Sequence, residues 1–508
     1  MTKKNFILSG FILLKFLLQY ALINPYYDLH RDEYLHLDQG NHLAWGYLSV
    51  PPVTSWISFV VQSLGNSMFW VKFFPALFGA LTVLVVWKTI EELKGNLFAL
   101  VLGATCTVFS ILLRLNFLFQ PNSFDVLSWT LFYFLLIKYF NTEKAKWLYI
   151  AAIVFAIGFL NKYNVVFMLI GIFPSILMTG QRKIFFQKEF YGSILVGLLL
   201  ILPNIVWQYN NGFPVFHHLS RLAKYQLVNV DRWNFLKDQV LYFIGALPVI
   251  IASLYALLFY EHFKKYRVFF WIFIFTLTVF IYFKAKSYYA IGLYPIYIAF
   301  GSTFLGSVLN SSWKRYLKPV VIAVPLLFYI FLYDIVYSIE TPAEVIKKEN
   351  VYREYGLLRW EDGRDHTLPQ DFADMLGWKE LALKVDSIYT QLPEEQYSFI
   401  LCDNYGQAGA INYYAKNKKI KAVTFDADYI NWFNLDSKIE NVIRVKGFEE
   451  SGEEIGLSSP FFTSSYVAGS ITNPLAREYK TTIFVFRKAK ADINQKLEIE
   501  LAEEKNER

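Results

Sequence analysis

Hydrophobic positions along this chain are gathered into long runs, which short polar segments separate. A helix needs about 20 predominantly apolar residues to cross a bilayer core about 30 Å thick. A shorter apolar run, residues 53–64, begins after a Pro-Pro pair and is predicted to be an interfacial or re-entrant helix. Eleven other runs are predicted to span the membrane: residues 6–23, 69–90, 97–113, 124–140, 148–160, 165–178, 194–206, 240–260, 268–283, 289–309 and 320–337.

The pattern changes after about residue 340, where charged residues become frequent and no apolar run is long enough to span. Residues 407–416 have helical spacing between two β-rich runs, which favours a β-α-β unit. We therefore predict a separate α/β domain over residues 341–490, followed by a charged tail, 491–508, that forms a solvated helix or a frayed end. The predicted strands are residues 398–402, 422–425, 442–445 and 482–486.

Composition narrows the class of protein. Of the 508 residues, 55% are hydrophobic and 18% are charged, and the mean hydropathy is +0.32. A soluble domain carries about 25% charged residues, so a cytosolic enzyme and a disordered protein are excluded. Two cysteines, Cys106 and Cys402, are too few for a disulfide framework. The net charge of +7 comes from lysines between apolar runs, which indicates contact with membrane lipids and no nucleic-acid partner.

Basic residues in the short loops predict the orientation. If Lys3 and Lys4 are cytoplasmic, every second loop is basic, as positive-inside topology requires. The transmembrane domain, residues 1–340, then has outer loops at 24–68 and 208–238, and the C-terminal domain is extracytoplasmic. No small-residue cleavage site follows the first run, so we expect a signal anchor.

The first outer loop contains an adjacent pair of acids, Asp32 and Glu33, close to the predicted membrane surface. A carboxylate beside apolar protein resists ionisation, so we expect a raised pKa and a base that works near neutral pH. The alternative is an interfacial loop whose charges serve solvation, with Arg31 as a salt-bridge partner.

Further candidate residues lie at the outer ends of other spans. Asp125 is predicted just inside the apolar region, where a carboxylate is costly and has a function or a partner; a first-turn acid favoured by the helix dipole is the alternative. Lys162, Lys284 and Lys286 lie in outer loops, where lysine is scarce. They indicate an anionic partner such as a lipid phosphate, with simple snorkelling as the alternative.

Motifs for other chemistries are absent from the sequence. There is no phosphate-binding P-loop, no dinucleotide fingerprint and no nucleophilic serine elbow. His217 and His218 are adjacent, which is not the spacing of a helical zinc pair. We predict no metal site and no cofactor, and leave a dependence on divalent metal open.

Several motifs, taken in order, resemble those of the GT-C glycosyltransferases, in the bacterial branch related to protein O-mannosyltransferases and to the aminoarabinose transferases of lipid A. The likeness begins at Asp32-Glu33-Tyr34 and covers most of the chain. No single motif is decisive, and the order and placement carry the resemblance. The other motifs are Leu43-Ala-Trp-Gly-Tyr47, Pro51-Pro52, Pro121 to Asp125, Phe159-Leu-Asn-Lys-Tyr163, Leu202-Pro-Asn-Ile-Val-Trp207, Lys286-Ser-Tyr-Tyr289 and Asn404-Tyr-Gly-Gln-Ala-Gly409.

This resemblance implies a GT-C fold and an enzyme that moves a sugar from a polyprenyl-phosphate carrier to an outer-side acceptor. The family's catalytic carboxylate corresponds to Asp32, with Glu33 beside it. The sequence departs from relatives at Val50, where they often have Lys or His, and at Asn122, where many have an acid; Asp125 is the local substitute. The candidates for donor-phosphate binding are Arg31, Lys162, Lys284, Lys286, Tyr288 and Tyr289.

The combined prediction is a multi-pass glycosyltransferase of the bacterial inner membrane, with its active site on the periplasmic side. Asp32 acts as base in an inverting direct displacement, and basic residues stabilise the leaving phosphate. The sugar is left open, as is the acceptor: a lipid, a glycan or a protein. The main alternative is a flippase or transporter for the lipid-linked sugar, which would place ionisable residues near the middle of several spans. Hydrolysis of the donor and a binding module on a membrane anchor are further alternatives.

Overall fold

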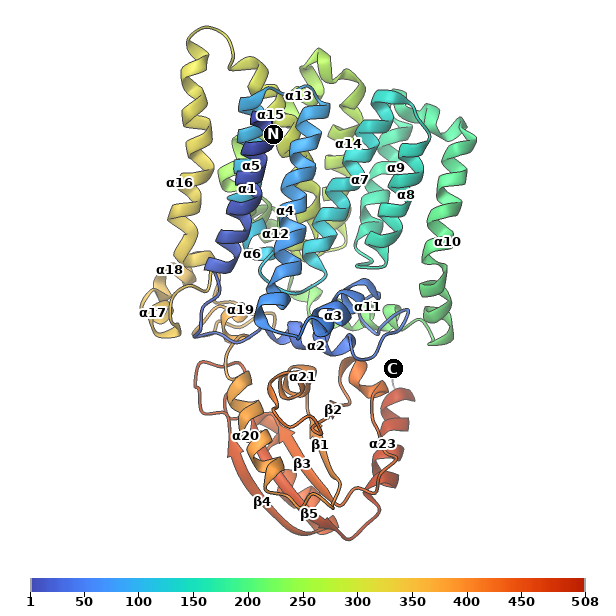
Figure 1. Ribbon diagram of the computed structural model, residues 1–508, viewed down its shortest axis with the longest axis vertical. Helices are drawn as coiled ribbons and strands as arrows, with labels where there is room; N and C mark the ends of the chain where they lie inside the picture. The colour runs from blue at the N-terminus through green and yellow to red at the C-terminus, as the bar shows by residue number, and fades with distance from the viewer. Residues whose placement is uncertain (1, 507–508) are drawn as a thin grey trace.

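The computed structural model describes residues 2–506 and contains a helical bundle with a mixed α/β domain at one end (Figure 1). The bundle's helices run roughly side by side, with α16 at one margin and α10 at the other. They are α1 (Lys3–Ala21), α4 (Met68–Glu92), α5 (Leu97–Val108), α6 (Leu112–Leu115), α7 (Asn122–Thr142), α8 (Lys146–Phe159), α9 (Val165–Leu177), α10 (Lys188–Asn210), α12 (Arg232–Tyr242), α13 (Leu247–Phe259), α14 (Arg267–Tyr282), α15 (Tyr294–Val308) and α16 (Lys318–Val336).

The bundle is that of a multi-pass membrane protein. Each of the eleven predicted spans is mainly helical. Within residues 2–506, six helices are long and apolar enough to cross a membrane, and two bent pairs raise the number to eight. The bend between α9 and η1 (Gly180–Phe186) is 107°. The bend between α12 and the segment Ile244–Phe259, which includes α13, is 67°. The difference from eleven arises because α5 and α8 are short and α1 carries three lysines.

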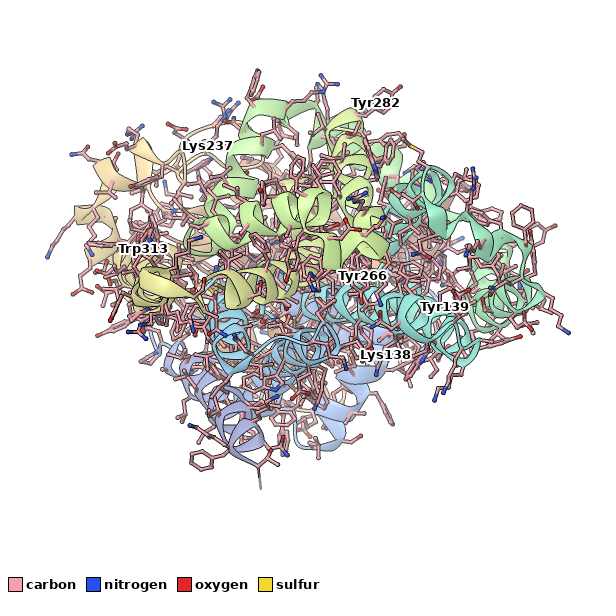
Figure 2. All side chains as sticks on the ribbon, turned by 90° about the horizontal axis from the view of Figure 1, so that it is seen from above. Lys138, Tyr139, Lys237, Tyr266, Tyr282 and Trp313 are labelled. Atoms are coloured by element: carbon pink, nitrogen blue, oxygen red, sulfur yellow. The ribbon has the colours of Figure 1, made fainter. Side chains whose placement is uncertain are left out.

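One end of the bundle carries the basic loops predicted to be cytoplasmic, and the C-terminal domain lies at the other end (Figure 1). Figure 2 views the basic end and labels Lys138, Tyr139 and Tyr266 there. Lys138 pairs with Glu92 at 2.7 Å, and the Tyr266 hydroxyl donates to Asn141. Polar contacts therefore join α4, α7 and the segment before α14 at this end.

Three short helices lie across the opposite end, between the bundle and the C-terminal domain: α2 (Arg31–Gln39), α3 (Val53–Ser63) and α11 (Pro214–Tyr225) (Figure 1). The run predicted to be interfacial or re-entrant is α3. Its Ser58 hydroxyl donates to the Leu37 carbonyl at 2.8 Å, which joins α3 to α2. Residues 22–67, the first loop of the bundle, thus form a platform between the bundle and the C-terminal domain (Figure 1).

The C-terminal domain is built on a mixed sheet in the order β2-β1-β3-β5-β4. β1 pairs in parallel with β2 and β3, whereas β5 runs antiparallel to β3 and β4. All four predicted strands are present. The fifth, β4, has the polar sequence FTSSYVAGS and gave no hydrophobic signal. The strands are β1 (Ser398–Cys402), β2 (Ala422–Thr424), β3 (Asn441–Lys446), β4 (Phe462–Ser470) and β5 (Thr482–Ala489).

Alternate residues of β1 face different helices. Ile400 and Cys402 belong to the core beneath α20 and α21, and Phe399 and Leu401 to the core beneath α23. The predicted tail is helical, and Leu497 buries one face of it against the sheet; its last two residues, 507–508, lie outside the described part. The helices of this domain are α17 (Pro342–Lys347), α18 (Glu349–Glu354), α19 (Gln370–Ala373), α20 (Trp378–Thr390), α21 (Tyr405–Tyr414), α22 (Glu454–Ser458) and α23 (Ile493–Asn506).

Close packing of α21 against α2 fixes the C-terminal domain on the platform. A Cβ atom at Gly409 would lie 2.7 Å from both the Tyr34 Cβ and the Tyr429 hydroxyl, so glycine permits the approach. Asp38 of α2 accepts hydrogen bonds at 2.7 Å from Asn412 and from Tyr429. The two parts therefore meet through a buried polar network beside the site described below.

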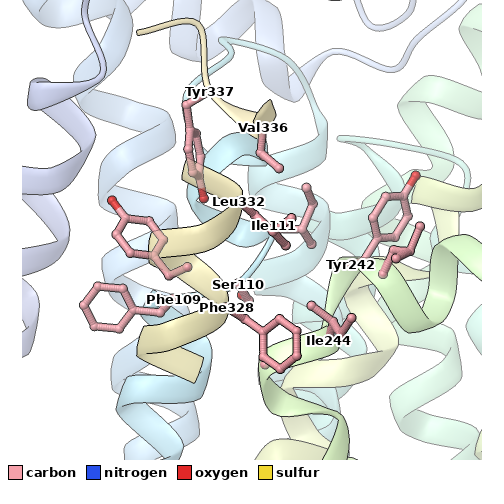
Figure 3. Close-up of a pocket in the computed structure, with 12 residues that line it drawn as sticks. Phe109, Ser110, Ile111, Tyr242, Ile244, Phe328, Leu332, Val336 and Tyr337 are labelled. Carbon is pink, nitrogen blue, oxygen red and sulfur yellow. The ribbon is translucent and has the colours of Figure 1, made fainter. Parts of the chain in front are cut away.

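A separate, largely apolar groove lies within the bundle, between α16 and the breaks that follow α5 and α12 (Figure 3). Phe109, Ile111, Ile244 and Leu332 line it. Its wall includes Tyr242, whose hydroxyl is 2.9 Å from the Ser287 hydroxyl at the platform end of the bundle.

Candidate active site

Asp32 occupies the first turn of α2 at the centre of the platform. The turn is fixed by a capping box, in which the His30 backbone N–H donates to Glu33 at 2.8 Å and His30 Nδ1 accepts from the Asp32 N–H at 3.2 Å. The Asp32 side chain is 38% exposed, whereas Glu33 is fully buried. Of the two adjacent acids, Asp32 is therefore the one that a ligand can reach.

Asp32 is contacted from both parts of the chain. The Tyr405 hydroxyl, at the start of α21, donates to Asp32 Oδ1 at 2.7 Å. From the bundle, Gln120 Nε2 donates to Oδ2 at 3.2 Å, and His30 Nδ1 lies 3.9 Å from the same oxygen. Both carboxylate oxygens are thus oriented, one by each domain.

The carboxyl group of Asp32 is held in its ionised form. Burial alone would raise its pKa, but the charges of His30 and Arg31 and the Tyr405 hydrogen bond outweigh burial and lower the pKa to about 2. The raised pKa expected from the sequence is therefore wrong. The sequence indicated the apolar surroundings of Asp32. It did not indicate the cations beside the carboxylate or the Tyr405 hydroxyl, which comes from a distant segment.

A chain of hydrogen bonds leads from Asp32 to Lys162. Gln120 bonds Asp32 through its amide nitrogen, and its Oε1 accepts from Asn122 Nδ2 at 2.9 Å. Asn122 Oδ1 in turn accepts from Lys162 Nζ at 2.7 Å. An acid and a cation are thus held at the two ends of one network of amide side chains.

Lys162 lies between α8 and α9 and faces two aromatic rings. Its ammonium is 4.4 Å from the ring centre of Tyr289 and 5.1 Å from that of Tyr288, both in η5 (Ser287–Leu293). Burial, with the nearby charge of Lys286, lowers the pKa of Lys162 to about 8, although Asp125 opposes this change. A partly desolvated ammonium is well suited to binding an anionic ligand.

The other predicted phosphate ligands differ in their contacts. Lys286 pairs with Glu361 of the C-terminal domain at 2.6 Å. Arg31 stacks over the Tyr405 ring at 4.6 Å, and its Nε is buried with no hydrogen-bond partner among the described residues. The structure therefore brings Arg31, Lys162, Tyr288 and Tyr289 toward the Asp32 network. Lys284 has a left-handed backbone (φ 51°), and no contact among residues 2–506 joins it to this network.

Glu33 faces away from Asp32 into the bundle. Lys72 Nζ lies 2.7 Å from its Oε1 and 3.0 Å from its Oε2, and the Phe119 backbone N–H donates to Oε1 at 2.7 Å. Because the His30 backbone N–H donates to Oε2, both carboxylate oxygens of Glu33 accept hydrogen bonds. This geometry gives Glu33 a role in holding α2 against α4.

Asp125 is also enclosed. Trp129 Nε1 donates to its Oδ1 at 3.0 Å, and Asn164 Nδ2 donates to its Oδ2 at 3.1 Å. Asn122, one turn earlier, makes the contact with Lys162 instead. Asp125 therefore does not replace the missing acid at Asn122; it anchors the loop that carries Lys162.

Sequence reasoning missed three contributors to this site. Tyr405 lies within one of the motifs named above and Gln120 directly before another, but no local pattern shows that a hydroxyl 373 residues away would reach Asp32. Lys72 did have a signal, because a lysine within an apolar run requires a partner. A prediction that Lys72 pairs with Glu33 would have distinguished Glu33, which anchors the turn, from Asp32, which faces the site.

Comparisons with known proteins agree with this architecture. The structure superposes on ArnT from Cupriavidus metallidurans bound to undecaprenyl phosphate with a TM-score of 0.63, covering 95% of this chain and 98% of that one at 11% identity. The same protein in the apo state gives 0.62 at 11% identity, with the same coverage. The chain therefore has the fold of these structures, the GT-C fold. AglB, an oligosaccharyltransferase from Archaeoglobus fulgidus, superposes with a TM-score of 0.50 at 10% identity, covering 88% of this chain and 70% of that one.

Sequence comparisons of this GT-C fold protein are more limited. Residues 49–207 match the model of the dolichyl-phosphate-mannose-protein mannosyltransferase family. No curated protein sequence gives a significant match. The matched segment contains Gln120, Asn122 and Lys162 but ends before Tyr405 and begins after Asp32. The amide network and the cation thus lie within the family match, and the acid lies in the loop just before it.

Proposed function

We propose that this protein is a membrane glycosyltransferase that moves a sugar from a polyprenyl-phosphate-linked donor to an acceptor hydroxyl or phosphate. The observation that carries the proposal is the network that places ionised Asp32 and the Lys162 ammonium at its two ends. The similar ArnT structure contains undecaprenyl phosphate, which supports a donor of this chemical class.

The reaction needs one base and one anion-binding group. The oxygen of an acceptor hydroxyl attacks the anomeric carbon while the bond from that carbon to the phosphate oxygen breaks, and the hydroxyl proton passes to Asp32. The phosphate leaves with an additional negative charge, which Lys162 and Arg31 stabilise. Because phosphate is already a good leaving group, no covalent enzyme intermediate is required, and direct displacement inverts the anomeric configuration.

The location of the site supports action on the side of the membrane opposite the cytoplasm. The predicted cytoplasmic loops lie at the far end of the bundle from α2, the helix that carries Asp32 (Figure 1). We accordingly assign the site and the C-terminal domain to the periplasmic face of a bacterial inner membrane. The sugar and the acceptor are not part of this assignment.

The transporter alternative has less support. It requires ionisable residues along a path through the membrane. Asp125 and Lys72 lie within the first two turns of their helices, at the platform end, and both have partners. These two charged residues therefore lie near the platform, as a reaction at the membrane surface requires.

Purified protein in lipid nanodiscs tests the function. It is incubated with a set of monosaccharides linked to undecaprenyl phosphate and with an envelope extract that supplies acceptors, and the release of free undecaprenyl phosphate is measured by mass spectrometry. We expect release with one sugar and its loss in Asp32→Asn. Asp365→Asn is the matched control, because Asp365 is half-exposed and pairs with Arg353 at 3.1 Å, outside the Asp32 network. Full activity of Asp32→Asn would overturn the mechanism.

A deletion strain identifies the acceptor. Mass spectrometry of its envelope lipids, glycans and glycoproteins is compared with that of the parent strain. A sugar that disappears from one of these classes identifies donor and acceptor together, and unchanged profiles in all three would argue against transfer.

A further inference from the structure

Tyr405 is the direct link between the C-terminal domain and the carboxylate of Asp32. Its hydroxyl donates to Asp32 Oδ1 at 2.7 Å, and the guanidinium of Arg31 lies over its ring at 4.6 Å. One side chain of the C-terminal domain therefore contacts both the acid and a neighbouring cation.

The turn that carries Tyr405 is held by hydrogen bonds within it and to the connection between β4 and β5. Asn404 caps α21 by accepting from the Gln407 N–H at 3.1 Å. The side chains of Asn404 and Gln407 both donate to Glu478, at 3.2 and 2.7 Å. A Cβ at Gly406 would lie 2.8 Å from the Trp378 ring, so the turn is also packed tightly. Tyr405 is thus presented from a fixed position.

The surroundings of Asp32 show what this hydroxyl contributes. Tyr405 fixes Oδ1 and Gln120 fixes Oδ2, which limits rotation of the carboxylate, while 38% of the side chain stays accessible. A hydrogen bond to the charged form also favours ionisation. The titratable and charged groups that face Asp32 are His30, Arg31, His36, Tyr288, Asp374 and Tyr405.

We propose that Tyr405 is a positioning residue for sugar transfer, through which the C-terminal domain completes the active site by holding the Asp32 carboxylate in a fixed orientation. This proposal rests on the proposed function. In the transfer step the acceptor proton moves to Asp32, the sugar–phosphate bond breaks, and Tyr405 retains its own proton while its hydrogen bond to Asp32 persists. The C-terminal domain is therefore part of the reaction machinery.

The test is Tyr405→Phe, which removes the hydroxyl and keeps the ring beneath Arg31. We expect kcat to fall by about tenfold to a hundredfold, because a hydrogen bond to a charged group is lost. The KM for the lipid-linked donor should change by less than about twofold, since the phosphate ligands are untouched. The acid limb of the kcat profile should move upward by about one pH unit, because Asp32 loses a group that stabilises its charge.

Tyr413→Phe is the matched control. Tyr413 lies on the same helix and also crosses to the platform, but its hydroxyl donates to the Asn66 carbonyl at 3.1 Å, not to Asp32. This variant removes one interdomain hydrogen bond and should leave kcat and the pH profile unchanged. Equal losses in the two variants would show that Tyr405 acts only in domain docking and would overturn the proposal.

A measurement without substrate separates this proposal from the proposed function. Infrared difference spectra, with Asp32→Asn as the blank, report protonation of the Asp32 carboxyl as the pH falls. Suppose that the wild-type protein transfers no sugar but the pKa of the Asp32 carboxyl is higher in Tyr405→Phe than in wild type. The electrostatic contact would then be retained and the proposed function rejected. Transfer by the wild type with no change of kcat, pH profile or infrared titration in Tyr405→Phe would reject the positioning role alone.

Discussion

Lys72 and Glu33 form an ion pair enclosed between α4 and α2, with Nζ 2.7 Å from Oε1 and side-chain exposures of 3% and 0%. Glu33 directly follows Asp32 in the chain, and its pairing with Lys72 determines the direction in which the two adjacent acids face. Because Glu33 is drawn inward to Lys72, Asp32 in the same helical turn is directed to the accessible side of the platform. One acid therefore anchors the turn while its neighbour faces the site.

The first prediction concerns this pair. Glu33→Gln should lower the free energy of unfolding by about 3–5 kcal/mol, because it leaves a buried ammonium without its counter-charge. Combining it with Lys72→Met should recover most of the loss, since no charge is then stranded. Thermal unfolding in detergent measures both effects, and transfer by the double variant should stay within about tenfold of wild type.

The exposed pair Lys88–Glu91 on α4 is the control for this prediction. Its atoms are 2.8 Å apart, but the lysine side chain is 47% exposed. Lys88→Met should change stability by less than about 1 kcal/mol. A Glu33→Gln protein of normal stability and no transfer activity would instead place Glu33 in the chemistry.

The second prediction is a pH dependence of donor binding. The pKa of Lys162 is lowered to about 8, so its ammonium is present below that pH and is lost as the pH rises through it. A lipid-linked sugar phosphate is a diester whose charge stays constant in this range. The donor KM should therefore rise about tenfold per pH unit above about pH 8, because only the charged lysine binds the phosphate strongly.

Lys162→Arg is the matched variant, because a guanidinium stays charged throughout this range. Its donor KM should be independent of pH, and that of Lys162→Met should be high at every pH. The profile is measured from about pH 6.5 to about pH 9.5, on either side of the titration. A wild-type KM that does not vary across this interval would exclude Lys162 as a phosphate ligand.

The architecture could be predicted from sequence much further than the site. Hydrophobic runs located the helices because a span must be apolar along its length. The same rule located four strands but not β4, whose residues are mostly polar. Asp32 and Lys162 could be found from their places in outer loops. Their link through Gln120 and Asn122 could not, because amide side chains have no characteristic spacing and their partners are set by tertiary contacts.

Electrostatics was the weakest part of the sequence-based prediction. The nearness of Asp32 to apolar protein suggested a raised pKa, whereas its neighbours lower it. The decisive groups come from separate segments, Tyr405 in particular. Desolvation can be anticipated from hydropathy, but the compensating charges depend on the fold.

The third prediction tests the close approach of α21 to α2. Gly409→Ala should lower stability by about 1–3 kcal/mol, because the new methyl group meets Tyr34 and Tyr429 at 2.7 Å. The displacement should also reduce kcat, since Gly409 is one turn after Tyr405 on α21. Gly456→Ala is the control, because a Cβ at Gly456 meets nothing within 4 Å. Unchanged unfolding and kcat in Gly409→Ala would contradict the tight docking described here.

The fourth prediction concerns Asp125, which holds the Lys162 loop without reaching the ligand. Both of its oxygens accept from N–H donors, Trp129 at 3.0 Å and Asn164 at 3.1 Å, and Asn164 also donates to the Tyr289 carbonyl at 3.0 Å. Asp125→Asn turns an NH2 group toward one of these donors. Stability should fall by about 1–3 kcal/mol, and the donor KM should rise about tenfold as Lys162 moves.

Trp129→Phe separates the two effects of that change. It removes the donor to Oδ1 but keeps the Asn164 bond, so it should lower stability and leave the donor KM near that of wild type. Steady-state kinetics and thermal unfolding of both variants provide the comparison. If Asp125→Asn lowered kcat as strongly as Asp32→Asn with no change in donor KM, Asp125 would have to act on the reacting atoms, and the anchoring role argued from its two hydrogen bonds would be incorrect.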